Sequence, residues 1–319
     1  MKILAILGHG NSLQEPLYRN YGCDVFYVYK KVNKFSSVIR RLIMETSHSK
    51  KYVSWLFKNI NLSQYDVIIL NECIFPAVIL NYIRYCNQNC KLIYIYWNTV
   101  FFNIPNNVEP RMYNSERQYY LLRECARKTK TEIVSFDKKD CETLGFIYNG
   151  QCCIDYRDKF IFDRSKKVDI FFCGQDKGRR DYINNLIKDF EQLGITYEII
   201  LKSKVSSNDK IKYINVPLSY ESVLHRMWES KAILDIVQTG QCGMTWRPIE
   251  ALFYKKKLIT TFQDIKKFDF YNKKNIFILG IDRMDELKKF LNDEYEEINS
   301  EIIEKYTFKK WLERIINRK

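Results

Sequence analysis

Residues 233–261 read ILDIVQTGQCGMTWRPIEALFYKKKLITT and contain every part of a strand–helix–strand unit. Residues 232–237 (AILDIV) and 257–261 (KLITT) are short apolar segments of the kind found in buried strands. Between them, Pro248 suits the first turn of a helix, where its missing N–H is not needed. The stretch therefore predicts a strand, a long polar loop, a helix and a second strand parallel to the first.

The same alternation continues in both directions along the chain. In the second half, further strands are expected at 168–174, 196–201, 211–216 and 275–279, with a helix at 180–194. In the first half, strands are expected at 2–7, 23–29, 65–72, 91–98 and 131–137. Strands that alternate with helices form parallel sheets covered on both faces. The predicted fold class is α/β, with two Rossmann-like domains facing a cleft.

The domain boundaries follow from breaks in this pattern. A length of 319 residues suits two medium domains. Periodicity is lost and charge is gained over residues 151–167, as in a connection between domains. We expect domains at 1–150 and 168–305, followed by a closing helix at 306–319. The apolar face of this helix carries Phe308, Trp311, Leu312, Ile315 and Ile316.

Composition narrows the classes of function. The formal net charge of +14 attracts phosphates on nucleic acid, on anionic lipid or on a diphosphate substrate. No run reaches the roughly 18 apolar residues of a membrane span, and the first residues do not form a signal peptide, so a cytoplasmic location is expected. The ten cysteines are expected to be reduced thiols, and the pairs Cys86/Cys90 and Cys152/Cys153 lack the spacing of a zinc site.

The loop at 238–245 carries groups that bind phosphates and sugars, and it leads into a helix N-terminus that favours anions. Glycines let the backbone approach a ligand closely, while hydroxyls, amides and a guanidinium can bind it. The candidate donor-binding residues here are Gln238, Thr239, Gly240, Gln241, Gly243, Thr245, Arg247 and Glu250. Glu250, at the expected third helical position, would accept hydrogen bonds from ribose or sugar hydroxyls. The alternative is that Glu250 only favours the helix start and Arg247 is a surface charge.

A second glycine-containing loop that leads into a helix N-terminus is expected in the first strand–helix unit of the same domain. The sequence VDIFFCGQDKGRR places an expected turn at Gly174 and then Lys177, Gly178 and Arg179 at the entry to a helix. Cations at that position are repelled by the positive end of the helix dipole, so an anion bound beside them would be stabilising. Two such loops favour a nucleoside diphosphate ligand, although a plain charged helix start is the alternative for each loop taken singly.

The second half resembles the donor domain of GT-B glycosyltransferases, in particular bacterial enzymes of surface-polysaccharide assembly (O-antigen, capsule or lipopolysaccharide). The resemblance is carried by DIFFCGQDKGR (169–179), SYESVL (219–224) and above all QTGQCGMTWRPIEAL (238–252), and more weakly by YWN (96–98) and SFDKKD (135–140). It implies transfer of a sugar, with a UDP-sugar as the expected donor, to a glycan or lipid-linked acceptor held by the first domain. By the same analogy Gly174, Lys177 and Arg179 flank the diphosphate.

The sequence departs from this family at one position that concerns the mechanism. Many retaining members carry a glutamate eight positions before the one that matches Glu250, and here that position is Cys242. Inversion is therefore favoured, and it needs a general base. His9, Glu72 and Asp137 are the candidates, because all three follow expected strands. Each also has a structural reading: a hydrogen-bonded loop residue for His9, a helix-start acid for Glu72 and a helix N-cap for Asp137.

No metal and no other cofactor are expected, because the chain has no Asp-x-Asp triplet and Lys, Arg and helix ends can neutralise the leaving group. Residues 29–60 combine apolar residues at helical spacing with many Lys and Arg, which predicts either peripheral contact with the inner face of an anionic cell membrane or an ordinary core-facing helix.

Three alternative functions remain: a basic protein that binds or modifies nucleic acid, a dinucleotide-dependent oxidoreductase, and a nucleotide-sugar binding protein without catalysis. Basic residues spread over both halves and the lack of a nucleic-acid motif argue against the first. The lack of a complete Gly-x-Gly-x-x-Gly pattern argues against the second.

Overall fold

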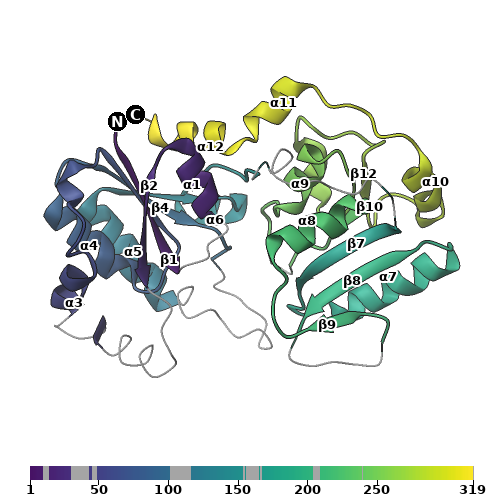
Figure 1. Cartoon of the computed structure of the whole chain (residues 1–319), viewed down its shortest axis with the longest axis horizontal. Helices are drawn as coiled ribbons and strands as arrows, with labels where there is room; N and C mark the ends of the chain where they lie inside the picture. Colours follow the sequence, from purple (N-terminus) through teal and green to yellow (C-terminus); the bar gives the residue numbers. More distant parts are fainter. Residues whose placement is uncertain are drawn as a thin grey trace. The chain divides into compact units, whose positions relative to one another are not determined.

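The structure, a computed structural model, divides into two compact units (Figure 1). It describes residues 1–9, 14–29, 43–44, 49–100, 116–153, 155, 165, 167–203, 209–238 and 240–318. The first unit comprises Met1–Gly150 together with Leu312–Lys319, and the second comprises Gln151–Trp311.

The first unit contains a six-stranded parallel sheet with the order β2-β1-β3-β4-β5-β6. Its strands are β1 (Ile3–His9), β2 (Asp24–Tyr29), β3 (Val67–Asn71), β4 (Lys91–Tyr96), β5 (Thr131–Ser135) and β6 (Ile147–Tyr148). Its described helices are α1 (Glu15–Tyr21), α3 (Ser49–Leu56), α4 (Pro76–Cys86), α5 (Glu116–Thr129) and α6 (Lys138–Leu144), with a short 3-10 helix at Leu62–Gln64. The five strands expected from the sequence are confirmed, and the two-residue β6 was not foreseen because it is too short to show a period.

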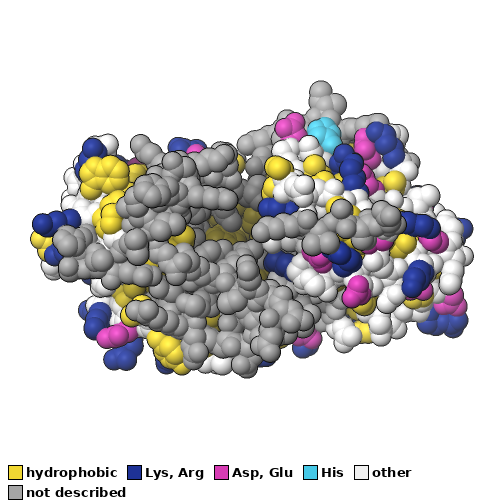
Figure 2. All heavy atoms as spheres, turned by 90° about the horizontal axis from the view of Figure 1, so that it is seen from below, with side chains coloured by type: hydrophobic (Ala, Val, Ile, Leu, Met, Phe, Trp, Pro, Cys, Tyr) yellow, Lys and Arg dark blue, Asp and Glu magenta, His cyan; other side chains and the backbone are white. Residues whose placement is uncertain are grey.

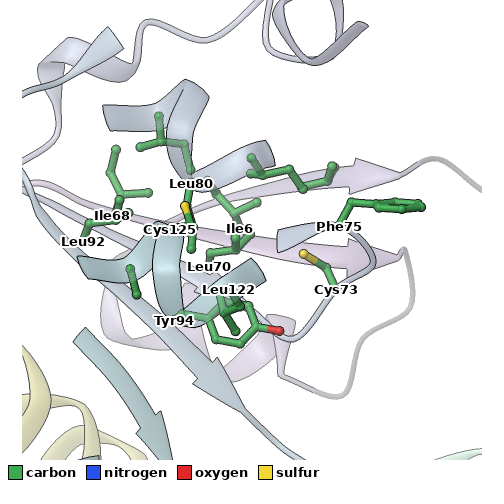
Figure 3. Packing of buried hydrophobic residues seen from close by; sticks show 14 of the residues in the cluster. Ile6, Ile68, Leu70, Cys73, Phe75, Leu80, Leu92, Tyr94, Leu122 and Cys125 are labelled. Atoms are coloured by element: carbon green, nitrogen blue, oxygen red, sulfur yellow. The ribbon is translucent and has the colours of Figure 1, made fainter. Parts of the chain in front are cut away.

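Helices α3, α4 and α5 pack over one face of this sheet (Figure 3). Alternate residues of the central strands, such as Ile6, Ile68 and Leu70, point towards Leu80 of α4 and Leu122 of α5. This alternation is what a strand period of two requires. The apolar runs of β3 and β4 are buried along nearly their whole length, as expected of central parallel strands.

The second unit also contains a six-stranded parallel sheet, with the order β12-β11-β10-β7-β8-β9. Its strands are β7 (Val168–Gln175), β8 (Tyr197–Lys202), β9 (Lys212–Ile214), β10 (Ser230–Asp235), β11 (Lys257–Thr260) and β12 (Ile276–Ile278). Its helices are α7 (Arg180–Gln192), α8 (Tyr220–Trp228), α9 (Arg247–Phe253), α10 (Leu287–Asn292) and α11 (Ser300–Lys305), with 3-10 helices at Gln263–Lys267 and Met284–Glu286. Counted from β7, this is the strand order 6-5-4-1-2-3 of a Rossmann fold.

Helices cover both faces of the second sheet. Phe171 of β7 faces the core formed with α8 and α9, whereas its neighbours Ile170 and Phe172 face the core formed with α7 and α10. The α/β class with two Rossmann-like sheets is thus confirmed. The sequence prediction also holds for the last helix, α12 (Phe308–Ile316), because all five residues of its expected apolar face are buried.

Candidate functional site

The topology of the second sheet points to one place for a ligand. Strands β7, β8 and β9 follow one another towards one edge, and β10, β11 and β12 towards the other. The direction of winding therefore reverses between the neighbouring strands β7 and β10. In open parallel sheets ligands bind at such a switch point, beyond the carboxyl ends of the strands. The two loops singled out from the sequence are the ones that leave β7 and β10.

The loop after β7 is a tight turn at residues 176–179. The Arg179 N–H donates to the Asp176 carbonyl at 2.9 Å, and Lys177 and Gly178 have φ values of +46° and +78°. Two successive positive φ values are typical of a type I′ turn, which glycine adopts without strain. The turn expected at Gly174 is therefore wrong by three residues, since Gly174 still belongs to β7.

Gly174 serves the site by making room for Arg179. A Cβ at Gly174 would lie 3.1 Å from Arg179 Nη2 and 3.1 Å from Phe172 Cζ, closer than side chains normally pack. The guanidinium lies over the Phe172 ring, 5.3 Å from its centroid. The missing side chain is what lets the guanidinium lie against the end of the strand.

The Arg179 guanidinium joins the two loops. It donates from Nη1 to the Ile236 carbonyl after β10 at 2.7 Å, from Nη2 to the Gln175 carbonyl, and from Nε to the Asp176 carbonyl at 3.3 Å. A guanidinium has five N–H groups, so two have no partner among the described residues. Burial lowers the pKa of Arg179 from its usual value, and nearby Arg247 lowers it further, while Asp235 and Asp176 oppose this. An anion at this point would relieve the burial of the charge.

The loop after β10 turns at Gln238–Gln241. The Gln241 N–H donates to the Gln238 carbonyl at 3.0 Å, and Gly240, the third residue of the turn, has a φ of +84°. The Gln241 side-chain amide then donates to the Gly243 carbonyl at 2.8 Å and holds the rest of the loop. Thr239, the predicted hydroxyl donor of this turn, lies outside the described residues.

Two backbone amides are available at these turns. Gly178 and Gly240 are exposed, and their N–H groups have no hydrogen-bond partner within the described parts of the chain. Backbone amides at glycine turns are suited to phosphate oxygens because no side chain blocks their approach.

Beneath these loops lies Asp235, a residue that the sequence reasoning missed. It is 2% exposed, and it accepts hydrogen bonds from the hydroxyls of Thr245 and Thr260, each at 2.8 Å. Burial raises the pKa of this carboxyl, while the two threonine bonds, Arg247 and Arg179 act in the opposite direction. The available signal was an acid in the otherwise apolar segment AILDIV, where only a paired carboxylate is tolerated. Thr245, a candidate donor-binding residue, donates to Asp235, and its contact with a ligand stays a prediction.

Half-buried Arg247 and buried Glu250 form an ion pair at the start of α9. The Arg247 guanidinium binds a Glu250 carboxylate oxygen at 2.5 Å and the Cys173 carbonyl of β7 at 2.9 Å. Burial tends to lower the pKa of Arg247, but Glu250 outweighs it and the net direction is upward. The other Glu250 oxygen accepts from the Tyr220 hydroxyl of α8 at 2.6 Å. Arg247 is thus tied to β7 and is not a free surface charge.

Glu250 differs from its expected placement in two respects. It is the fourth residue of α9, not the third, because the helix already begins at Arg247. It is 2% exposed and both of its oxygens have protein partners. The hydrogen bonds expected between Glu250 and ligand hydroxyls stay a prediction. In the structure, Glu250 orients the Arg247 guanidinium.

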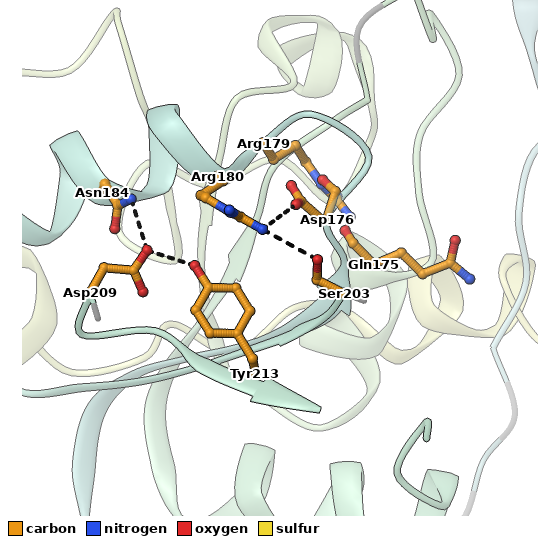
Figure 4. Close-up of polar contacts among 8 residues, drawn as sticks. All are labelled: Gln175, Asp176, Arg179, Arg180, Asn184, Ser203, Asp209 and Tyr213. Carbon is orange, nitrogen blue, oxygen red and sulfur yellow. Dashed lines mark hydrogen bonds and ion pairs between the residues drawn. The ribbon is translucent and has the colours of Figure 1, made fainter. Parts of the chain in front are cut away.

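Arg180, next to Arg179 in the sequence, belongs to a separate polar group on the side of β8 (Figure 4). It lies 3.2 Å from a carboxylate oxygen of Asp176 and 3.2 Å from the Ser203 hydroxyl, over the ring of Tyr213. Only the first arginine of the RR pair therefore reaches the switch point. Lys177 sits at the tip of the intervening turn and is half-buried.

The first sheet has a switch point of its own, between β1 and β3. His9 is the last residue of β1, and its side chain lies outside the described part of the structure. Glu72 directly follows β3 and is half-buried. One of its oxygens accepts from the backbone N–H of Trp97 at 3.1 Å and from the Asn98 amide at 2.8 Å. The residues YWN therefore orient Glu72 from the end of β4, which the sequence did not reveal.

Asp137, the third candidate base, is the N-cap of α6. It is 1% exposed and caps α6, accepting from the backbone N–H groups of Lys139 and Asp140 at 3.0 and 3.2 Å. The N-cap alternative is the one that the structure supports. Its neighbour Asp140 accepts from the Val100 N–H at 2.7 Å, and burial raises the pKa of Asp140 to about 7.

Other predicted features concern metals, thiols and membranes. Among the described residues there is no group of three or more His, Cys, Asp and Glu side chains arranged to hold a metal ion. The ten cysteines form no disulfide bonds, and Cys242 in the loop after β10 is exposed. Within the described parts of the chain, every helix is too short or too polar to pass through a bilayer.

Of the apolar residues that suggested a helix at 29–60, Phe35, Val38, Ile39 and Leu42 lie outside the described residues.

Comparisons with known proteins gave structural neighbours only. No protein-family model and no curated protein matches the sequence. Among solved structures, the glycotransferase of kitacinnamycin aligns with a TM-score of 0.47 and 10% identity over 99% of this chain and 96% of its own. CalG4, the calicheamicin glycosyltransferase, aligns with a TM-score of 0.39 and 10% identity over 99% and 94%. UDP-N-acetylglucosamine 2-epimerase aligns with a TM-score of 0.45 and 12% identity over 99% of this chain and 94% of its own.

Proposed function

We propose that the chain is a GT-B-type glycosyltransferase and that its second unit binds a nucleoside diphosphate sugar. The observation that carries this proposal is the meeting of two loops at the switch point between β7 and β10. There Arg179 bonds to carbonyls of both loops, Arg247 bonds to β7, and the amides of Gly178 and Gly240 have no partner among the described residues. Guanidinium groups and glycine-turn amides together are the groups that bind a diphosphate.

These residues would act on the charge that develops during transfer. The bond between the anomeric carbon and the diphosphate oxygen breaks, and the nucleoside diphosphate leaves with the electron pair. Arg179, Lys177 and the two glycine amides would stabilise that negative charge without reorganising, which is the most effective form of electrostatic catalysis. Asp235 and Glu250 would act as positioning residues, since they hold Thr245 and Arg247 beneath the loops.

For the first unit we propose acceptor binding and the general base. Glu72 is the base that the observations support best, because Trp97 and Asn98 fix one of its oxygens. It would take the proton of the acceptor hydroxyl as the hydroxyl oxygen attacks the anomeric carbon from the side opposite the diphosphate, with inversion. A UDP-sugar donor and a glycan or lipid-linked acceptor of bacterial surface polysaccharide are proposed from the sequence resemblance alone.

Nucleotide binding by Arg179 gives the first test. A melting series with UDP, GDP, CMP and dTDP should show at least one nucleoside diphosphate raising the melting temperature by about 5 °C at ~100-fold excess over Kd. Arg179→Lys should weaken that binding by about tenfold or more, since an ammonium cannot keep a fork of bonds to two loops. Arg180→Lys is the matched control and should bind like the parent. Absence of any shift, or equal loss in both variants, would remove the site.

Turnover by Glu72 gives the second test. Glu72→Gln keeps the bonds from Trp97 and Asn98 but cannot take a proton, so kcat should fall by ~10²-fold or more with nucleotide affinity unchanged. Asp137→Asn, which preserves the helix cap, should leave kcat near the parental value. The rate of sugar transfer to an acceptor is measured for the parent and for both variants. Nucleotide binding without any turnover in the parent would instead identify a nucleotide-sugar binding protein without catalysis.

A further inference from the structure

Helices α3 and α4 of the first unit expose large aromatic side chains surrounded by lysines. Trp55 of α3 is 58% exposed and Tyr85 of α4 is 68% exposed. Lys50, Lys51 and Lys58 are exposed around them. We call these five residues the aromatic–basic surface. Isolated exposed aromatics are ordinary, but here two of them lie on helices α3 and α4, which pack against each other, and each ring has a lysine beside it.

Contacts between the two helices hold this surface together. The Lys50 ammonium of α3 lies 4.3 Å from the ring centroid of Tyr85 on α4, and the Lys58 ammonium lies 5.8 Å from that of Trp55. The Trp55 ring also stacks on Tyr52, with centroids 5.8 Å apart. The cations are therefore interleaved with the rings and not set apart from them. Figure 2 shows hydrophobic and Lys or Arg side chains, with some Asp or Glu, along the outer edge of the half that contains the first unit.

Half of the chain's net positive charge comes from one stretch of sequence, residues 30–65, which includes α3. Residues 30–65 contain eight Lys or Arg and one Glu, a net charge of +7 out of the chain's +14. The other residues of 1–150 carry twelve Lys or Arg against eleven Asp or Glu. Of these eight cations, Lys50, Lys51 and Lys58 belong to the described residues, in α3 and just after it, and the other five lie outside them.

We propose that the aromatic–basic surface docks on the headgroups of an anionic lipid bilayer. Tryptophan and tyrosine favour the membrane interface because their rings are apolar at one end and polar at the other. Lysines near an anionic membrane contribute about fivefold each to binding, and their apolar stems reach past the rings. This inference goes beyond the proposed transfer reaction and does not depend on it.

Sedimentation with vesicles tests the proposal directly. The whole chain should bind vesicles of phosphatidylcholine with about one-third phosphatidylglycerol, bind pure phosphatidylcholine more weakly by about 100-fold or more, and be released by salt near 0.5 M, where the Debye length is a few ångströms. Replacing Lys50, Lys51 and Lys58 by Gln should reduce the partition coefficient by about 50-fold or more. Trp55→Ala combined with Tyr85→Ala should also lower it. The exposed positions should keep the fold, which a melting curve checks.

A second triple variant isolates position from total charge. Lys188→Gln, Lys266→Gln and Lys273→Gln remove the same charge from exposed sites of the second unit and should leave vesicle binding unchanged. Equal loss in both triple variants, or equal binding to neutral and anionic vesicles, would overturn the proposal. Tight binding of a single-stranded oligonucleotide, lost in the first triple variant and without vesicle binding, would assign the surface to nucleic acid. Nucleotide binding at Arg179 should be the same in all these variants, so failure here leaves the transferase proposal standing.

Discussion

At the scale of single residues, Arg179 and Arg180 are neighbours in the sequence with different surroundings. Arg179 reaches carbonyls of the loops after β7 and β10, whereas Arg180 pairs with Asp176 and Ser203 beside β8. The turn at Lys177 and Gly178 and the missing side chain at Gly174 produce this difference. Two identical side chains therefore have different roles because the backbone between strand and helix aims them differently.

Gly174 carries a prediction for this reason. Gly174→Ala would place a Cβ 3.1 Å from the Arg179 guanidinium and from Phe172, so Arg179 must move and its bonds to both loops must weaken. We expect nucleotide affinity to fall by about tenfold, with a stability loss of ~1–3 kcal/mol from overpacking. Calorimetric titration with the nucleotide found above measures the first effect.

Gly8→Ala is the matched control for that variant. Its Cβ would meet the Glu72 carbonyl at 3.3 Å and Cys73 Cβ at 3.4 Å, a similarly tight place in the first unit. It should cost stability without changing nucleotide affinity. Equal affinity in the parent and in Gly174→Ala would show that Arg179 does not bind the nucleotide.

Asp140 carries a prediction about pH. Its pKa is raised by burial from 3.8 to about 7, so the folded chain keeps this proton over a window in which the unfolded chain has lost it. The free energy of unfolding should therefore fall as the pH rises from about 4 to about 7, by at most ~4 kcal/mol from this group. Asp140→Asn keeps an acceptor for Val100 and cannot ionise, so this fall should be absent.

Urea unfolding at about pH 4.5 and about pH 8 measures the effect. We expect the free energy of unfolding of Asp140→Asn, relative to that of the parent, to be larger at the higher pH than at the lower pH. Glu142→Gln, an exposed change in the same helix, should follow the parent at both values. A constant difference between Asp140→Asn and the parent would show that Asp140 is already ionised at the lower pH.

At the scale of elements, α12 shows how far a hydrophobic pattern can be trusted. Its five predicted apolar positions are all buried, and Trp311 is 1% exposed and stacks on Phe308 with ring centroids 5.6 Å apart. The pattern did not say which domain the helix would join. Phe308–Trp311 group with the second unit, and the residues from Leu312 onward group with the first.

Trp311 should therefore matter for stability more than any exposed residue of its helix. Trp311→Ala should lower the free energy of unfolding by ~3–5 kcal/mol, because it removes a large buried ring and leaves a cavity. Lys309→Ala, an exposed change on the same helix, should stay within ~0.5 kcal/mol. Denaturant midpoints of the two variants give the comparison. A loss below ~1 kcal/mol for Trp311→Ala would mean that α12 is only loosely packed.

At the scale of the whole molecule, the chain offers two switch points of the kind that bind ligands. One lies between β1 and β3 and the other between β7 and β10. Nucleotide should bind the second one, because only there do the described residues combine two arginines with amides at glycine turns. Each unit has its own sheet and its own core, so protection from hydrogen exchange can report on each one separately.

Hydrogen exchange with and without the nucleotide makes this choice measurable. The strongest added protection is expected in peptides that cover 174–180 and 236–247, because amides that bind phosphate exchange slowly. Inorganic phosphate at the same concentration is the control for simple anion binding. Strongest protection at residues 8–9 and 71–75 would move the nucleotide site to the first unit.

The sequence by itself determined the strands, their parallel alternation with helices, the loops after 174 and 237, and the buried face of the last helix. These are local consequences of hydrophobic period, glycine and proline, which neighbouring residues suffice to set. Only the tertiary structure decided that Arg179 joins two loops, that Asp235 and Glu250 are buried beneath them, and that Asp137 is a cap while Trp97 and Asn98 hold Glu72. Those contacts link residues up to 57 positions apart for Arg179 and 26 for Asn98, so strand order and not local pattern brings them together.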